Sequence, residues 1–371
     1  MRQKLDIIWN ISLICPWDCE ICCVDAVHVS GDNSDVIIRS NTLNTVDILE
    51  KERGKSIFDL AAERRQKQGL ELNLEQKLQV LENLRGNYIV KINLSGGDPL
   101  VVSENLHIIK MASELFGKNN TQISTTGAGL SRYKPEELAS FIGKLKFSYD
   151  GPNGIYNPNR PLTYNDSNLR KASRFSENGI FTIAEVPLSV RNIDPLVIAL
   201  LYENLSQAKI DQALIMRLFP VGRGMNVPQE LPTREQYLRA IEKFKELEKQ
   251  YKKPEIRLQC ALKHLYNENR NNESNPCDLF RESFAITSKG ILITSAWAIG
   301  PTGEPLDEAF VLGDVSKNHI EELLRSEKAR YYQEHLADNF GQCKIFSYLN
   351  SRKQNPLERI HDKSDPLYVS L

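Results

Sequence analysis

Apolar and β-branched side chains gather in short runs along the first part of the chain. Six such runs cover residues 5–13, 88–96, 121–127, 144–150, 180–188 and 212–220. Five of them are nearly continuous, which is typical of parallel strands whose two faces are both covered. The pattern therefore predicts six parallel strands before residue 221.

The segments between these runs follow the period of an amphipathic helix. In residues 73–85 leucines recur every three or four positions, and Asn73 and Gln76 have the spacing of a capping box. Ser103 is the expected N-cap of the next helix. The predicted helices cover residues 73–85, 103–116, 135–142, 167–178 and 195–207. Alternating strands and helices predict an α/β fold, as a sheet or a partial barrel, with its chemistry at the carboxyl ends of the strands.

Residues 25–70 interrupt this alternation, because they are longer than an ordinary connection between a strand and a helix. Within them, residues 51–69 have the composition of a highly charged helix. Two interpretations remain open for this insertion: an inert surface element, or a lid that contacts substrate.

The character of the chain changes after residue 225. Residues 226–250 read as a linker helix capped by Thr233, and residues 251–371 as a second, smaller domain. Within that domain, residues 284–294 are expected to form a hairpin. We therefore expect a first domain over residues 1–225, the linker helix, and a C-terminal domain.

Charge and hydropathy exclude several classes of partner. The 371 residues carry a formal net charge of −1, so no overall field favours nucleic acid or anionic lipid. No apolar stretch is long enough to span a bilayer, and no signal-peptide cleavage pattern is visible. We expect a cytoplasmic protein with no nucleic-acid or membrane partner and with reduced cysteines.

Four of the seven cysteines lie directly after the first strand. Cys15, Cys19 and Cys22 have the spacing C-x3-C-x2-C, and Cys23 follows without that spacing. Clustered thiols in a reduced compartment indicate metal binding or catalysis. A closed zinc site takes four ligands, whereas three thiolates on a 4Fe–4S cluster would leave one iron open to another ligand.

A second motif, Gly-Gly-Asp-Pro at residues 96–99, stands where the second strand ends. Gly96 and Gly97 allow a backbone to approach a ligand closely, and Asp98 can accept a hydrogen bond from an ammonium group. By itself this motif is equally typical of a plain turn.

Taken together, the two motifs resemble those of the radical S-adenosylmethionine (radical SAM) enzymes. In that family C-x3-C-x2-C follows the first barrel strand and a Gly-Gly-Glu-Pro-like motif ends the second. The resemblance covers residues 5–225 and includes segments at the ends of the third to sixth strands: TTG (125–127), SYDG (148–151), EVPLSVRN (185–192) and PVGRG (220–224). Ile21 stands where the family has an aromatic residue, and Asp98 where it has glutamate.

The resemblance implies a partial (β/α)6 TIM-type barrel with two cofactors. Cys15, Cys19 and Cys22 would be catalytic metal ligands, each binding one iron of a 4Fe–4S cluster whose fourth iron binds S-adenosylmethionine. The implied contacts of S-adenosylmethionine are Gly96, Gly97, Asp98 and Pro99 at its amino group, Ser148 and Asp150 at its ribose, and Glu185, Asn192 and Arg223 elsewhere.

The C-terminal domain resembles a degenerate SPASM/twitch-like extension of these enzymes, with an α+β fold. Such extensions bind auxiliary clusters through more cysteines than Cys260, Cys277 and Cys343, and Ser295 stands at one position where they have cysteine. Two alternatives stay open: one auxiliary 4Fe–4S cluster on these three thiols, or none, with one thiol serving as a hydrogen-atom donor.

The implied function is reductive cleavage of S-adenosylmethionine to a 5′-deoxyadenosyl radical that abstracts a hydrogen atom from the substrate. A flavodoxin or ferredoxin would donate the electron. Relatives with this architecture mostly modify peptides by crosslinking, epimerisation or oxidation, which is our preferred interpretation. The alternatives are a dehydrogenase or epimerase of a sugar or aminocyclitol, and a non-catalytic iron–sulfur or zinc protein with the same fold.

Overall fold

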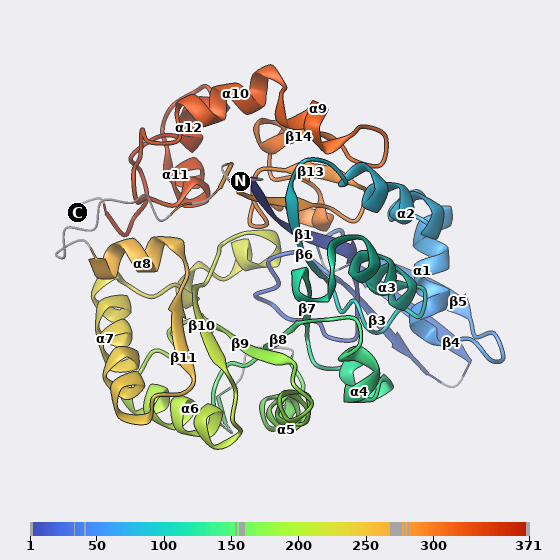
Figure 1. The fold of residues 1–371 in the computed structure, drawn as a ribbon, viewed down its shortest axis with the longest axis horizontal. Coiled ribbons are helices and arrows are strands. Elements are labelled where there is room, and N and C mark those ends of the chain that lie inside the picture. The colour runs from blue at the N-terminus through green and yellow to red at the C-terminus, as the bar shows by residue number, and fades with distance from the viewer. Residues whose placement is uncertain are drawn as a thin grey trace.

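The computed structural model describes residues 3–32, 34–40, 42–152, 154–155, 160–267, 277, 279–280 and 282–368. Helices cover the outside of a strongly curved sheet (Figure 1). None of the helices in these ranges is long and apolar enough to cross a membrane.

The six predicted strands are all present and lie side by side in chain order. They are β1 (Lys4–Ser12), β6 (Ile89–Gly96), β7 (Thr121–Thr125), β8 (Lys144–Ser148), β9 (Phe181–Leu188) and β10 (Gln212–Arg217). Every neighbouring pair among them is parallel. The α/β fold with a partial barrel is therefore confirmed.

Further strands extend both edges of this barrel sheet. On one edge β11 (Glu255–Leu258) pairs in parallel with β10. On the other edge β12 (Ser283–Ile286) pairs in parallel with β1, and β13 (Ile291–Ile293) and β14 (Val311–Asp314) continue in antiparallel order. The hairpin predicted in this region is confirmed as β12 and β13, and it belongs to the same sheet as the barrel. The predicted division into domains stays a prediction.

The helices that cover the barrel also follow the predicted pattern. They are α2 (Leu74–Asn83), α3 (Asn105–Phe116), α4 (Pro135–Leu138), α5 (Tyr164–Glu177), α6 (Pro195–Gln207) and α7 (Arg234–Tyr251). The capping box of Asn73 and Gln76 is present at the start of α2. Ser103 as the cap of α3 is wrong, because its hydroxyl donates to Asp59 at 2.8 Å and α3 begins after Glu104.

The insertion forms a small sheet with one helix packed on it. Its strands are β3 (Val27–Gly31), β4 (Asp35–Ser40) and β5 (Thr45–Glu50), joined to β2 (Ile14–Cys15), and the helix is α1 (Ile57–Lys67). Leu60 and Ala61 of α1 are buried with Val29 and Val36 of the sheet. The predicted charged helix over residues 51–69 is thus present, but it covers less of the segment than expected.

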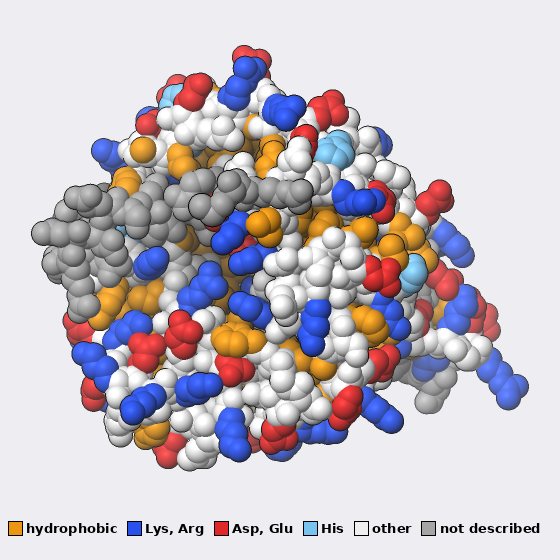
Figure 2. Space-filling view, in the orientation of Figure 1, with side chains coloured by type: hydrophobic (Ala, Val, Ile, Leu, Met, Phe, Trp, Pro, Cys, Tyr) orange, Lys and Arg blue, Asp and Glu red, His pale blue; other side chains and the backbone are white. Residues whose placement is uncertain are grey.

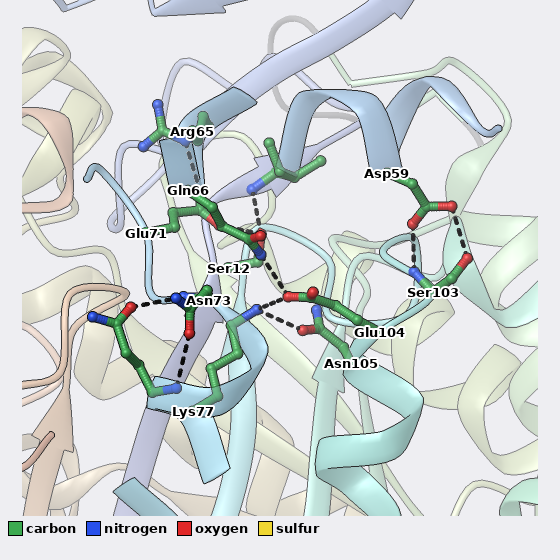
Figure 3. A network of polar contacts seen from close by, with 12 residues as sticks. Ser12, Asp59, Arg65, Gln66, Glu71, Asn73, Lys77, Ser103, Glu104 and Asn105 are labelled. Carbon is green, nitrogen blue, oxygen red and sulfur yellow. Dashed lines mark hydrogen bonds and ion pairs between the residues drawn. The ribbon is translucent and has the colours of Figure 1, made fainter. Parts of the chain in front are cut away.

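A buried carboxylate, that of Glu71, ties this insertion to the end of β1 (Figure 3). Glu71 accepts hydrogen bonds from the Ser12 hydroxyl at 2.8 Å, the Leu13 amide at 3.0 Å and Arg65 Nε at 2.8 Å. Its side chain is fully buried. Because an unpaired buried charge costs several kcal/mol, this network fixes the backbone that leads into β2.

The C-terminal region consists of short helices packed near the end of β10. They are α8 (Cys260–Asn267), α9 (Ile320–Leu324), α10 (Glu327–Glu334), α11 (Lys344–Asn350) and α12 (Pro356–Ile360). Arg217 at the end of β10 forms a bidentate ion pair with Asp365, with distances of 2.8 and 3.1 Å. Its guanidinium also lies 3.4 Å from the ring centre of Phe346 in α11. The last described segment is thereby fastened to the barrel. The predicted polar loop over residues 269–276 lies outside the described residues.

Candidate active site

The barrel encloses a cavity of about 750 Å³ along its inner face. The side chains that line it from β1, β6 and β8 occupy alternate positions: Asp6, Ile8, Asn10, Lys91, Asn93, Ser95, Lys144, Lys146 and Ser148. Most of these are polar. The expectation that apolar packing covers both faces of the strands is therefore wrong for the inner face, which surrounds a polar cavity.

The three spaced cysteines lie at the carboxyl end of this cavity and all line it. The amide of Trp17 donates to Cys15 Sγ at 3.4 Å, and the amide of Ala26 donates to Cys22 Sγ at 3.3 Å. Amide donors of this kind stabilise thiolate ligands. The chain itself does not favour ionisation, since burial raises the pKa of Cys15 and Cys19. A bound cationic cluster would supply the missing positive charge.

These thiols fit an iron–sulfur cluster better than a single ion. Within the described part of the chain, no three His, Cys, Asp or Glu side chains converge closely enough to hold one metal ion. In a 4Fe–4S cluster each thiolate binds a different iron, so the sulfurs need not reach a common centre.

Gly96 and Gly97 line the same end of the cavity. The neighbouring backbone leaves no room for a Cβ at either position. Gly96 has φ +124°, and a Cβ there would lie 2.0 Å from the carbonyl oxygen of Ser12. A Cβ on Gly97 would lie 2.2 Å from the carbonyl oxygen of Ile14. The amide of Gly97 donates to Ser12 O at 2.8 Å. Only glycine can hold β6 this close to the backbone that enters the cysteine loop.

Comparison with known proteins agrees with this arrangement. A family model described as a 4Fe–4S single cluster domain matches residues 12–171. Among solved structures, SuiB of Streptococcus suis bound to its precursor peptide SuiA superposes with a TM-score of 0.58 at 14% identity. That match covers 88% of this chain and 66% of SuiB. The structure of anSMEcpe with bound AdoMet gives a TM-score of 0.56 at 15% identity, covering 88% of this chain and 82% of that one. No curated protein matches.

The chain thus matches a 4Fe–4S single cluster domain over residues 12–171 and shares the fold of SuiB and anSMEcpe. The family model supports the 4Fe–4S cluster that the motifs predicted, and anSMEcpe, which has the same fold, was solved with bound AdoMet. At these identities the solved structures establish the fold alone. The chain also spans less than two thirds of SuiB, so activity and substrate are matters for proposal.

Asp98, the third residue of the radical SAM glycine motif, does not line the cavity. It is fully buried, and its carboxylate accepts hydrogen bonds from the hydroxyls of Thr125 (2.9 Å) and Thr126 (2.6 Å). The amides of Leu100 and Gly129 donate to it as well, each at 3.1 Å. This geometry favours a positioning role, in which Asp98 joins the ends of β6 and β7. Pro99, the next residue, is also buried and away from the cavity.

Arg223 lies behind the cysteine loop and not inside the cavity. Its Nε donates to the carbonyl oxygen of Cys19 at 2.8 Å, and its Nη1 contacts Asp25 Oδ1 at 3.1 Å. Nη1 also donates to the carbonyl oxygen of Ala26 at 2.5 Å. The side chain is 4% exposed. Arg223 is therefore placed to hold the loop in shape, and its contacts do not include the space for S-adenosylmethionine.

The other residues assigned to S-adenosylmethionine divide into two groups. Ser148 and Glu185 line the cavity, and Glu185 accepts a hydrogen bond from Ser124 at 3.3 Å. Asp150 and Asn192 are buried outside it. The amide nitrogen of the Asn192 side chain donates to the backbone carbonyl of Asp150 at 2.9 Å, which joins the ends of β8 and β9. Of these four residues, Ser148 and Glu185 border the space in which S-adenosylmethionine would bind.

Arg160 is a site residue that no sequence motif indicated. Its Nε donates to Cys19 Sγ at 3.2 Å, and its Nη1 forms an ion pair with Asp150 at 2.7 Å. The guanidinium also lies over the rings of Trp17 and Tyr164. An arginine donor on a ligand thiolate would stabilise the added negative charge of a reduced cluster.

The three C-terminal cysteines do not share one environment. Cys260 lines the cavity, whereas Cys277 and Cys343 are buried outside it. Burial raises the pKa of Cys343 to about 12, so this thiol stays protonated at neutral pH. Its amide donates to Asp365 at 2.9 Å. The auxiliary cluster on these residues stays a prediction.

Proposed function

We propose that the chain is a radical SAM enzyme that modifies a peptide. The observation that carries this proposal is the shape of the cavity. Its carboxyl end holds Cys15, Cys19, Cys22 and the two glycines, and the rest extends down the barrel, with room for a substrate beside the cofactors.

A 4Fe–4S cluster held by Cys15, Cys19 and Cys22 would, when reduced, supply the electron for cleavage of S-adenosylmethionine and so the means to abstract a hydrogen atom from the substrate. The chain's own residues position the reactants. The three thiolates hold the cluster, and the backbone of Gly96 and Gly97 borders the space beside it. The side chain of Ile21 offers an aliphatic surface there. Enclosure by the barrel limits access of water to the radical.

Two observations on similar proteins support a peptide substrate. SuiB has been solved with its precursor peptide SuiA, and anSMEcpe with the Cp18Cys peptide. A peptide segment in extended conformation would also suit a cavity that runs along the barrel. Crosslinking, epimerisation or oxidation of a residue would all begin with the same hydrogen abstraction. A flavodoxin or ferredoxin would supply the electron.

A hydroxyl-rich small molecule is the second candidate. The middle of the cavity is lined by the amides of Asn10, Asn93 and Gln122 and by the hydroxyl of Ser124. Asn93 donates to Ser124 at 3.0 Å. Such groups can exchange hydrogen bonds with the hydroxyls of a sugar or aminocyclitol, and dehydrogenation or epimerisation would be the reaction.

The deciding experiment is anaerobic reconstitution with iron and sulfide, followed by dithionite and S-adenosylmethionine. We expect 5′-deoxyadenosine, detected by chromatography, from the wild type and none from Cys19→Ala. Cys23→Ala is the matched control, because Cys23 lacks the spacing of the other three. Absence of 5′-deoxyadenosine from an iron-loaded wild type would favour the non-catalytic iron–sulfur protein.

The same preparations test the auxiliary cluster. Iron is counted on a variant in which Cys15, Cys19 and Cys22 are all alanine. Iron retained by that variant would have to lie in the C-terminal region, and Cys277→Ala in the same background should remove it. A variant free of iron would rule out an auxiliary cluster on Cys260, Cys277 and Cys343.

A further inference from the structure

Four cations line the end of the cavity opposite to the cysteines. They are Lys91 at the start of β6, Lys144 and Lys146 of β8, and Arg257 of β11. Each occupies a position on its strand from which the side chain faces the cavity. Figure 2 shows Lys and Arg side chains gathered around the hollow at the centre of this face of the molecule. The facing anions on the cavity wall are Asp6 and Glu255.

These cations are poorly neutralised by the protein. Within the described residues, none of the four forms an ion pair within 4.0 Å. Glu255, which faces them, accepts a hydrogen bond from Gln212 at 3.1 Å. The pKa of Lys144 is lowered by its burial and then by Lys91, Arg257 and Lys146, with only Asp6 acting in the opposite direction. Repulsion between these cations therefore disfavours the charged form of Lys144 inside the cavity.

Three other cations of the cavity wall differ, because the protein already pairs them, whereas Lys263 of α8 also lines the cavity without a carboxylate partner among the described residues. Lys245 contacts Glu248 at 2.7 Å, and Arg217 is held by Asp365. Arg160 pairs with Asp150. Unpaired positive charge thus concentrates at the amino ends of the strands, where low-dielectric walls strengthen the field.

Lys91 and Lys144 also lie far from the cysteine end of the cavity, and Lys146 stands between Lys144 and that end. Lys91 lies five residues before Gly96 on β6, and Lys144 lies four residues before Ser148 on β8. A strand rises about 3.3 Å per residue, so these backbone positions are roughly 13–16 Å apart. One continuous cavity nevertheless connects the two ends.

We propose that Lys91, Lys144, Lys146 and Arg257 bind an oxyanion of the substrate, a carboxylate or a phosphate, while the reacting carbon lies at the cysteine end. This proposal rests on the proposed function and deepens it. The separation of the two ends sets the length of the substrate, which corresponds to roughly four or five residues of extended peptide. An acidic peptide side chain and a phosphorylated small molecule are the two sources of such a group.

The test is a calorimetric titration of the cluster-loaded chain without reductant, using two probes. The peptide Glu-Glu-Glu represents the carboxylate source, and inorganic pyrophosphate represents the phosphate source. We expect the wild type to bind at least one probe, with an affinity that falls as salt is raised. The double variant Lys91→Gln/Lys146→Gln should bind it at least about tenfold more weakly.

The matched control is Lys118→Gln/Lys249→Gln, which removes two exposed lysines outside the cavity and should leave the affinity unchanged. The probe that binds more tightly identifies the source of the oxyanion. The proposal is overturned if the wild type binds neither probe, or if both double variants weaken binding equally. Because the titration needs no cleavage of S-adenosylmethionine, anion binding without 5′-deoxyadenosine would refute the proposed function and uphold this site.

Discussion

Replacing Arg223 by methionine tests whether this residue supports the cysteine loop or binds S-adenosylmethionine. The substitution keeps much of the volume and removes the donors to Cys19 and Ala26. It also leaves Asp25, which is 2% exposed, without its buried cation. Removing one partner of a buried ion pair typically costs about 3–5 kcal/mol. We expect the free energy of unfolding to fall by that amount, as measured by urea denaturation under anaerobic conditions.

The same variant should lose iron, because Arg223 fixes the loop that carries three ligands. After reconstitution, the iron content per chain should drop well below that of the wild type. The control is the double variant Arg223→Met/Asp25→Asn, which leaves no unpaired charge. Asn also tolerates the positive φ of +48° at this position. We expect the double variant to recover about 1–2 kcal/mol, and the single variant Asp25→Asn completes the cycle from which the coupling energy of the pair is obtained.

One result would refute this reasoning. If Arg223→Met unfolds within about 1 kcal/mol of the wild type, the ion pair contributes little. If it also keeps its iron but loses affinity for S-adenosylmethionine, Arg223 contacts the cofactor directly, as the family resemblance implied. Calorimetric titration of S-adenosylmethionine into the two iron-loaded proteins distinguishes these cases.

The remaining predictions concern backbone packing, pH and the fourth cysteine. Gly97→Ala would place a Cβ 2.2 Å from a backbone carbonyl oxygen and should cost roughly 3 kcal/mol in urea denaturation, whereas Gly300→Ala meets only ordinary contacts and should cost little. Burial, followed by Lys344, lowers the pKa of His361 from 6.5 to about 4. Between these values only the unfolded chain is protonated, so stability should fall by about 2 kcal/mol from pH 7.5 to pH 5, and His361→Gln should lose this dependence. Cys23→Ala should keep the wild-type iron content, and a loss of iron would make Cys23 a ligand.

The elements of the barrel were predictable because their signals are local. Each strand and helix shows its own period, and the capping boxes at Asn73 and Thr233 both form as predicted. The pairing of β12 with β1 was not predictable, because those strands are far apart in the sequence and no local pattern encodes their contact. The strands that extend this edge of the barrel sheet are therefore determined by tertiary contacts.

The polar cavity was missed for a different reason. In β8 the sequence KLKFS alternates, with Leu145 and Phe147 fully buried on the outer side and Lys144 and Lys146 on the cavity side. Apolar residues at every second position resemble a run that is covered on both faces when the lysines between them are disregarded. A strict count of the period of two would have predicted one apolar and one polar face.

The sequence indicated where the candidate site lies, and the roles of its residues stay predictions. Cysteine spacing and paired glycines are chemical signatures, so the sequence located them correctly at the carboxyl ends of the strands. The contacts of Asp98, Asn192 and Arg223 depend on how loops from different strands meet, and this information is not local. Arg160 has no motif at all, since its place beside Cys19 follows from the turn that leads into α5.

These contacts share one pattern, which explains why the motifs of the superfamily surround the cysteine loop. The backbone around the cysteines is held through its carbonyl oxygens: Ser12 and Ile14 accept from the amides of Gly97 and Asp98, and Cys19 accepts from Arg223. None of these bonds uses a cysteine sulfur. The protein thus fixes the loop by its backbone, and Cys15, Cys19 and Cys22 line the cavity beside Cys23, where thiolates can hold a cluster.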